Sequence, residues 1–316
     1  MAKVKSMNNR NLIGTLGGAV YYMRAGENVA REKAAFVTNP RSTSQMNQRV
    51  RLANLVNFYR ANRSWMFRGA FENKPAKLSD YNAFVSRNIQ TSNIALTKAE
   101  ANAGAVIVDT YQVTDGSLPM ANYSYDQGGV LLSVPGNSAA ANINVQAFVN
   151  NILNDYAGVQ KGDQMSVIIL VNKRDASGVP RLSVLPYEIT LDATDIDDIN
   201  DLIGGPSTSL SVTSVAGGFK FAIPAVAGAA IGYAICFSRT TASGIKVSPS
   251  FVVLSDTTFK EGYSSETQFQ KAIDSYGESV ANFLDSGSVT AGDSNTPSGD
   301  EDQGGSGSGD PGDVEP

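Results

Sequence analysis

The sequence predicts an α+β fold. We expect an N-terminal β-hairpin followed by helices, then an antiparallel β-sandwich-like domain with an inserted helix, and finally a C-terminal helix with a disordered acidic tail. Three observations support this class. Apolar side chains recur at helical spacing after Ser42, short Val-, Ile- and aromatic-rich runs alternate with turns from Ala103 to Asp256, and no aromatic residue follows Asp285. The predicted parts are residues 1–100, 101–256, 257–285 and 286–316.

Composition narrows the function classes. The 316 residues include no histidine, which removes the usual general base near neutral pH and the commonest metal ligand. The single cysteine, Cys236, lies in an apolar run, so we expect a buried small hydrophobic residue. Paired carboxylates could serve a glycosidase without histidine, but no spacing brings a particular pair together. We therefore predict no enzyme, no cofactor and no metal site.

The chain shows no membrane signal. No uninterrupted apolar run reaches the about 18 residues of a membrane helix, and the first residues lack the apolar stretch of a secretory leader. We expect no membrane span and no membrane partner.

The first predicted element is a β-hairpin within residues 12–36. The β-favouring run from Val20 to Met23 precedes a turn at residues 25–28 and a second short run. The stretch "GTLGG" lacks the Gly-Lys-Ser/Thr ending of a phosphate loop and precedes a strand, so we interpret it as a flexible lead into the hairpin. Because an isolated hairpin is only marginally stable in water, this one should pack on the rest of the chain or on another chain.

A helix is predicted to begin near Ser42. The preceding "NPR" places a proline turn before it, and Ser42 with Gln45 has the spacing of a capping box. Apolar residues from Met46 recur at three- and four-residue spacing to about Tyr59, which indicates an amphipathic helix. The side chains expected largely outside its apolar side are Arg49, Asn57 and Arg60.

Two shorter helices should follow. "SWMFRGAF", Ser64–Phe71, continues the helical pattern until it is broken at Asn73-Lys74-Pro75. Ser79 is then placed to cap a third helix. The apolar side of this third helix consists of Tyr81, Phe84 and Val85.

The pattern changes to short strands after residue 103. One amphipathic helix at residues 142–158 interrupts them, with Gly158 placed to stop it. Regular short strands with at most one helix indicate an antiparallel sandwich. A last amphipathic helix is expected over residues 266–284. The predicted strands are residues 105–113, 128–134, 164–174, 181–191, 210–224, 231–239 and 246–255.

Charge is distributed unevenly along this chain of net charge −5. Basic residues outnumber acids from Lys3 to Lys98, whereas acids cluster at residues 192–201 and after Asp285. Arginines interleaved with aromatic residues suit either a subunit interface or phosphate contact in a nucleic acid, and we favour the interface. The candidate interface residues are Arg41, Gln45, Gln48, Arg49, Arg51, Arg60 and Arg63.

The acidic cluster at residues 192–201 has the oxygen ligands that calcium prefers. It lacks the central glycine and terminal glutamate of a helix-loop-helix calcium site. We favour a solvated loop or an acidic interface patch.

Several segments resemble one protein family. "NPRSTSQMNQRVRLANLVNFYR" resembles the Asn-Pro-Arg, Gln and Gln-Arg signature of an uncharacterised family found widely in Bacteroidetes and their bacteriophages. "GTLGGAVYYMRAG" is similar to that family's glycine-rich hairpin, "FRGAFENKPAKLSDYNAFVSRN" to its next segment, and "FKFAIPAVAGAAIGYAICFSRTTASGIKVSPSFVVL" to the end of its β-domain. The resemblance covers most of residues 10–255 in patches. The helix around Phe148, the last helix and the acidic end depart from it.

The resemblance implies a role in a virus particle. Members in crAss-like phages imply a virion ring protein of the neck or tail, stacked below the portal, and the family supplies no catalytic residue. We therefore expect a structural subunit of a homo-oligomeric ring in a bacteriophage tail or head-to-tail connector, made in the host cytoplasm. Its expected partners are other copies of itself and the portal or adjacent ring proteins, and any DNA contact would not be sequence-specific.

Two alternatives stay open. One is a carbohydrate- or cell-surface-binding β-module, although the single tryptophan, Trp65, lies in a predicted helix rather than on a sugar-stacking surface. The other is a structural protein that contacts nucleic acid, with an affinity that falls steeply as salt rises.

Overall fold

The computed structural model has the predicted α+β class. It describes residues 2–3, 13–24, 27–34, 42–66, 69–139, 144–192, 199, 203–206 and 210–276. The predicted acidic tail lies outside these residues, as does the part of the last helix beyond Tyr276. The helices are α1 (Thr43–Met66), α2 (Asp80–Asn88), α3 (Lys98–Asn102), α4 (Val145–Asp155), α6 (Thr258–Ser264) and α7 (Glu266–Ser275).

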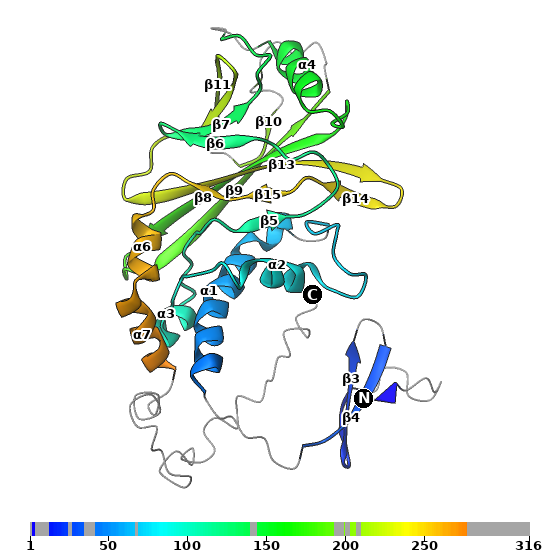
Figure 1. The fold of residues 1–316 in the computed structure, drawn as a ribbon, viewed down its shortest axis with the longest axis vertical. Helices are drawn as coiled ribbons and strands as arrows, with labels where there is room; N and C mark the ends of the chain where they lie inside the picture. The colour runs from blue at the N-terminus through cyan, green and yellow to red at the C-terminus, as the bar shows by residue number, and fades with distance from the viewer. Residues whose placement is uncertain are drawn as a thin grey trace.

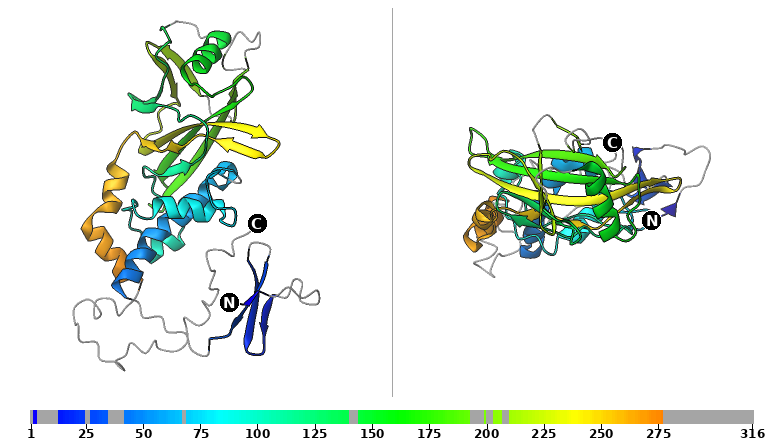
Figure 2. Two further views of the ribbon diagram at one scale, coloured as in Figure 1. Left: turned by 45° about the vertical axis from the view of Figure 1, so that its right-hand side comes forward. Right: turned by 90° about the horizontal axis from the view of Figure 1, so that it is seen from above.

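The predicted N-terminal hairpin is confirmed and belongs to a small antiparallel sheet. Its strands are β1 (Ala2–Lys3), β2 (Gly14–Leu16), β3 (Ala19–Arg24) and β4 (Glu27–Glu32), in the order β1-β4-β3-β2. "GTLGG" supplies β2 and a turn into β3, where Gly17 has a φ of 59° that suits glycine. Figures 1 and 2 show β3 and β4 apart from the other described layers. None of the four apolar clusters contains a residue of this sheet.

A long antiparallel sheet forms the middle layer. Its strands are β10 (Ile203–Gly204), β9 (Pro180–Thr190), β8 (Gln164–Arg174), β13 (Ala229–Thr241) and β14 (Gly244–Val247) in this order, and β16 (Val253–Leu254) also pairs with β13. The predicted strands at residues 164–174 and 181–191 are confirmed. The predicted strand at residues 246–255 is divided into β14, β15 (Ser250–Phe251) and β16, because β15 leaves the sheet to pair with β5 (Gln112–Thr114).

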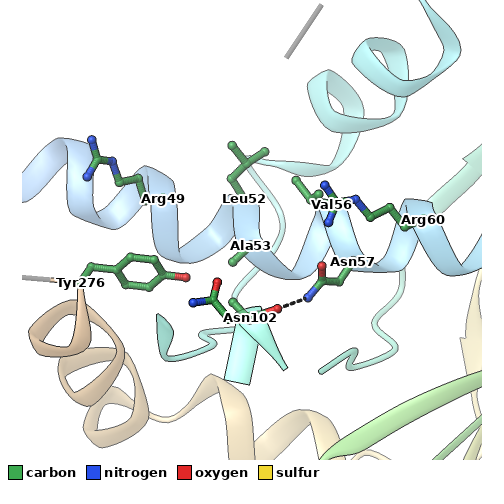
Figure 3. Close-up of a pocket in the computed structure, with 9 residues that line it drawn as sticks. Arg49, Leu52, Ala53, Val56, Asn57, Arg60, Asn102 and Tyr276 are labelled. Carbon is green, nitrogen blue, oxygen red and sulfur yellow. Dashed lines mark hydrogen bonds between the residues drawn. The ribbon is translucent and has the colours of Figure 1, made fainter. Parts of the chain in front are cut away.

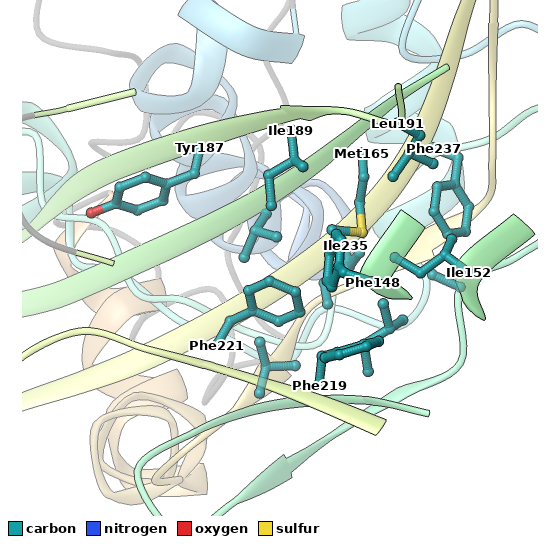
Figure 4. Close-up of a cluster of buried hydrophobic side chains, with 14 of the residues drawn as sticks. Phe148, Ile152, Met165, Tyr187, Ile189, Leu191, Phe219, Phe221, Ile235 and Phe237 are labelled. Carbon is teal, nitrogen blue, oxygen red and sulfur yellow. The ribbon is translucent and has the colours of Figure 1, made fainter. Parts of the chain in front are cut away.

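A smaller sheet and α4 cover one face of the middle layer. The smaller sheet has the order β11 (Ser211–Val215), β12 (Gly218–Ala222), β7 (Gly129–Ser133) and β6 (Tyr123–Asp126). The two antiparallel sheets enclose one apolar core, shown in Figure 4, so the sandwich-like arrangement is confirmed. The predicted inserted helix is α4, whose Phe148 ring lies 4.6 Å from that of Phe219.

Helices α1 and α2 cover the other face of the middle layer (Figures 1 and 2). Strand β8 is apolar on both sides: Val167 and Ile169 enter the sandwich core, whereas Ile168 and Leu170 enter the helix-covered core. The helix-covered core contains residues from both sides of the predicted division at residue 100.

Helix α1 is longer than predicted. The prediction that it ends near Tyr59 and that a second helix covers Ser64–Phe71 is wrong, since α1 continues to Met66 and Gly69 then adopts a φ of 95°. Within this continuous helix the buried Asn62 side chain donates to the Phe58 carbonyl one turn back at 2.8 Å and accepts from Trp65 Nε1 at 2.9 Å. The third helix is confirmed as α2, capped by Ser79.

The predicted strand at residues 105–113 is mostly wrong, because only β5 is a strand there. Residues 105–109 are buried, but asparagine side chains bond much of their backbone in place of a neighbouring strand. Asn54 on α1 donates to the Ile107 carbonyl at 2.8 Å and accepts from the Ile107 amide at 2.9 Å. On either side of Ile107, Asn172 on β8 accepts from the Val108 amide at 3.3 Å and donates to the Val106 carbonyl at 2.8 Å.

The C-terminal part contains one helix more than predicted. Helix α7 begins where expected, with Ser265 accepting from the Gln268 amide, but α6 precedes it. Helix α7 packs Ala272 and Ile273 against Met46 and Val50 in the first turns of α1. Helix α7 therefore lies beside the start of α1.

Candidate functional site

Three polar features position helix α1. At its start, the Ser42 hydroxyl accepts from the Gln45 amide at 3.4 Å, as the cap prediction requires, but Gln45 Oε1 is buried without a hydrogen-bond partner among the described residues. In its middle, Asn54 joins α1 to Ile107, and Asn57 donates to the carbonyls of Ala101 and Ala105 at 3.0 Å each. The expectation that Asn57 lies outside the buried side of the helix is therefore wrong.

A groove of about 280 Å³ runs along α1 (Figure 3). Arg49 and Arg60 stand eleven residues apart, close to three helical turns, so they share one face about 16 Å apart along the axis. The half-buried Leu52 and Val56 lie between them. The opposite wall comes from Ala101 and Asn102 at the end of α3 and from Tyr276 after α7.

The groove is basic on its α1 side. Helix α1 contains four arginines and no Asp or Glu. The nearby carboxylate of Glu100 is already held by the Thr97 amide and hydroxyl at 2.9 Å each and by Gln268 Nε2 at 3.2 Å. Burial raises the pKa of Tyr276, with Glu100 adding to the rise and Arg49 opposing it. Two exposed guanidiniums along one wall, with the uncharged phenol of Tyr276 near Arg49, suit a carboxylate or phosphate ligand.

The structure separates the predicted interface residues. Arg41 lies outside the described residues, and the groove unites Arg49 and Arg60. Gln48 and Arg63 are exposed on α1 outside the groove lining. Arg51 is half-buried, and its Nε has no hydrogen-bond partner among the described residues. The assignment of all seven to an interface stays a prediction.

Sequence reasoning missed the remaining walls of the groove. The recurrence of Arg49, Leu52, Val56 and Arg60 at three- and four-residue spacing identifies the α1 wall. No local signal identifies Asn102 or Tyr276, which tertiary packing brings there.

Other candidate residues have structural roles where they are described. Cys236 is buried as predicted, and burial raises the pKa of its thiol to about 12. Asp192 pairs with Lys161 at 2.9 Å, and the other acids of the 192–201 cluster lie outside the described residues, so calcium binding stays a prediction. In the described part of the chain, no acidic or cysteine side chains gather in a group that could hold a metal ion. The described helices include none with the length and apolarity needed to cross a membrane.

Comparison with family models, with curated proteins and with solved structures found no match to this chain.

Proposed function

We propose that the protein is a structural subunit of a homo-oligomeric ring in a bacteriophage tail or head-to-tail connector, located in the virion and without enzymatic activity. The resemblance of its Asn-Pro-Arg segment and glycine-rich hairpin to phage ring proteins supports the virion role. The observation that carries oligomerisation is the N-terminal sheet, which has no second layer among the described residues.

Both faces of this sheet carry apolar side chains. The strand register places Val20 and Tyr22 on one face, and Tyr21, Met23 and Leu16 on the other. Strand β3 is at most half-buried throughout, and Val29 is the one buried hydrophobic residue of the described strands of the sheet. A small sheet needs a packed apolar face for stability, so a second copy of the chain is the proposed source of the missing layer.

Leu16 on β2 and Ile13, the residue before β2, give the size of the expected contribution to association. Ile13 is 72% exposed and Leu16 is 66% exposed, the highest values among the large hydrophobic residues that the structure describes. Full burial of such a side chain contributes about 1.5–3 kcal/mol, so covering the exposed parts of both contributes about 3 kcal/mol per subunit contact. This corresponds to a more than 100-fold change in an association constant.

The test uses charge at these positions. The full chain should form rings visible by mass photometry and in electron micrographs, and Ile13→Asp/Leu16→Asp should shift it to smaller species at the same concentration. Met120→Asp is the matched control, because Met120 is 50% exposed and belongs to the sandwich domain. Only monomer in the wild-type protein and in disrupted virions would contradict the proposed function, as would intact rings in the double variant.

The proposed partners follow from charge. The basic face of α1 suits an acidic surface on a neighbouring subunit, the portal or an adjacent ring protein. The same arginines favour non-specific DNA contact as the second candidate function. Retention of DNA that weakens steeply between low and high salt, and that Arg49→Gln/Arg60→Gln abolishes, would support the second candidate.

A further inference from the structure

The groove on α1 is bounded by the last described residue before the acidic end of the chain. Tyr276, the last described residue, forms part of the groove wall. Nine residues separate Tyr276 from the acidic segment, defined as residues 286–316, which contains seven acidic residues and no Lys or Arg. The net charge of −5 for the whole chain therefore leaves +2 on residues 1–285. The acidic residues are Asp293, Asp300, Glu301, Asp302, Asp310, Asp313 and Glu315.

We propose that the acidic segment of the same chain docks along this groove, with its carboxylates on Arg49 and Arg60. The proposal names the occupant of the site and does not depend on ring formation.

Three basic groups lie along the groove or beside the end of α7. Arg49 stands across the groove from Tyr276 in Figure 3. Lys98 is exposed at the start of α3, and its backbone amide donates to the Ser275 hydroxyl at 2.8 Å, so this lysine lies beside the end of α7. Arg60 forms the far end of the groove. The chain therefore leaves α7 among cations and continues toward the seven acids of the segment.

The length of the connection fits the groove. Nine residues between Tyr276 and the segment reach at most about 30 Å, against about 16 Å between Arg49 and Arg60 along α1. The acid cluster at residues 300–302 follows Tyr276 by about 25 residues, which gives a flexible connection a root-mean-square span of about 25–30 Å. The effective concentration of the cluster at the groove is then on the order of millimolar.

Tethering matters because each contact is weak. An exposed arginine–carboxylate pair contributes little by itself, too little to hold a free peptide. Several such pairs can act together when both partners belong to one chain, because no second molecule has to be bound. Salt should release the segment, since the screening length falls from about 20 Å at low ionic strength to a few Å near 0.5 M.

The chain offers a direct measurement. It contains one tryptophan, Trp65 on α1, and one cysteine, Cys236, which is buried. Ser306→Cys therefore provides a selectively reactive thiol in the acidic segment, and an acceptor dye on it reports energy transfer from Trp65. In the full-length chain we expect transfer at 0.02 M NaCl to fall at least twofold at 0.5 M NaCl.

Two sets of variants test the contact. Arg49→Gln/Arg60→Gln in the groove and Asp300→Asn/Glu301→Gln/Asp302→Asn in the segment should each reduce low-salt transfer to the high-salt value. The control Lys161→Gln/Lys173→Gln removes two exposed charges from the sandwich domain and should leave transfer unchanged. Circular dichroism verifies that each variant is folded.

The proposal would be overturned if the energy transfer did not change with salt concentration. It would also be overturned if the low-salt transfer stayed unchanged in either set of variants. A tenfold excess of unlabelled chain distinguishes the source of the segment. Unchanged transfer supports docking within one chain, and reduced transfer would show exchange between copies and contradict the assignment. Because this signal arises inside one chain, its loss and the loss of rings are separate results.

Discussion

The substitution Asn54→Ala tests how α1 is held on the sheet. Asn54 is fully buried, and its side chain bonds the Ile107 carbonyl at 2.8 Å, the Ile107 amide at 2.9 Å and the Tyr111 hydroxyl at 2.8 Å. The Tyr111 hydroxyl retains Ser92 at 3.1 Å after the substitution, whereas both backbone groups of Ile107 lose their partner. A buried polar group left unsatisfied costs about 1–3 kcal/mol, so the free energy of unfolding should fall by about 2–6 kcal/mol.

Equilibrium denaturation of the full chain measures this loss. Circular dichroism follows the whole fold, and the fluorescence of Trp65 follows α1 itself. The matched control is Asn102→Ala, which removes an exposed amide next to the same helix and should change the free energy of unfolding by less than about 0.5 kcal/mol. If Asn54→Ala behaves like the control, the Ile107 backbone has other partners and the reasoning is wrong.

Two further variants test the core and the acid stability. Phe148→Ala should destabilise the fold by about 3–5 kcal/mol in the same denaturation assay, because its ring packs on Phe219 inside the sandwich; an effect below about 1 kcal/mol would refute a packed α4. Burial pushes the pKa of Glu72 upward, but hydrogen bonds from Ser117 outweigh this and hold it below its ordinary 4.5. Because the folded pKa is the lower one, this carboxylate contributes stability above pH 4.5 that is lost as the pH falls through the folded value. Glu72→Gln should therefore flatten the acid side of the stability profile, and a profile identical to wild type would contradict that role.

Local sequence signals predicted those helices and strands that depend on interactions between neighbouring residues. Ser79 caps α2 by accepting from the Asn82 amide at 3.2 Å, and β8 extends over the predicted residues 164–174. A serine before a helix and a β-branched run between turns act through their sequence neighbours, so their effect does not depend on the rest of the fold. The same applies to α4, whose apolar spacing is visible in the sequence.

Residues 105–111 show why other elements could not be predicted. Their composition is typical of a strand, and residues 105–109 are buried as a central strand would be. Asn54, 53 residues away, and Asn172, 64 residues from Val108, take the place of the missing strand neighbour. Side-chain amides can supply the same donor and acceptor as a backbone, and no local pattern distinguishes the two arrangements.

The candidate site likewise has one wall that the sequence predicts and one wall that it does not. Residues spaced like Arg49 and Arg60 must share a face of any helix, whereas Arg51, two residues from Arg49, points about 200° away. Helical geometry therefore selects two of the predicted arginines as one wall from their spacing alone. The opposite wall depends on α7 packing against the start of α1, through Ala272 and Ile273.

The packing of α7 on α1 also underlies the proposed docking of the acidic segment. If α7 lay elsewhere, the carboxylates after residue 285 would have no identified binding site. Their composition alone would then indicate only a contribution to solubility. With α7 beside α1, the last described residue, Tyr276, lies in the groove wall, and the proposed docking brings the acids to the arginines at high effective concentration. Charge complementarity within one chain thus depends on the apolar contacts of α7. Ile273→Asp, which places a charge in that contact, should uncouple the segment from the groove and lower the transfer from Trp65 even though every arginine and every acid of the segment is retained.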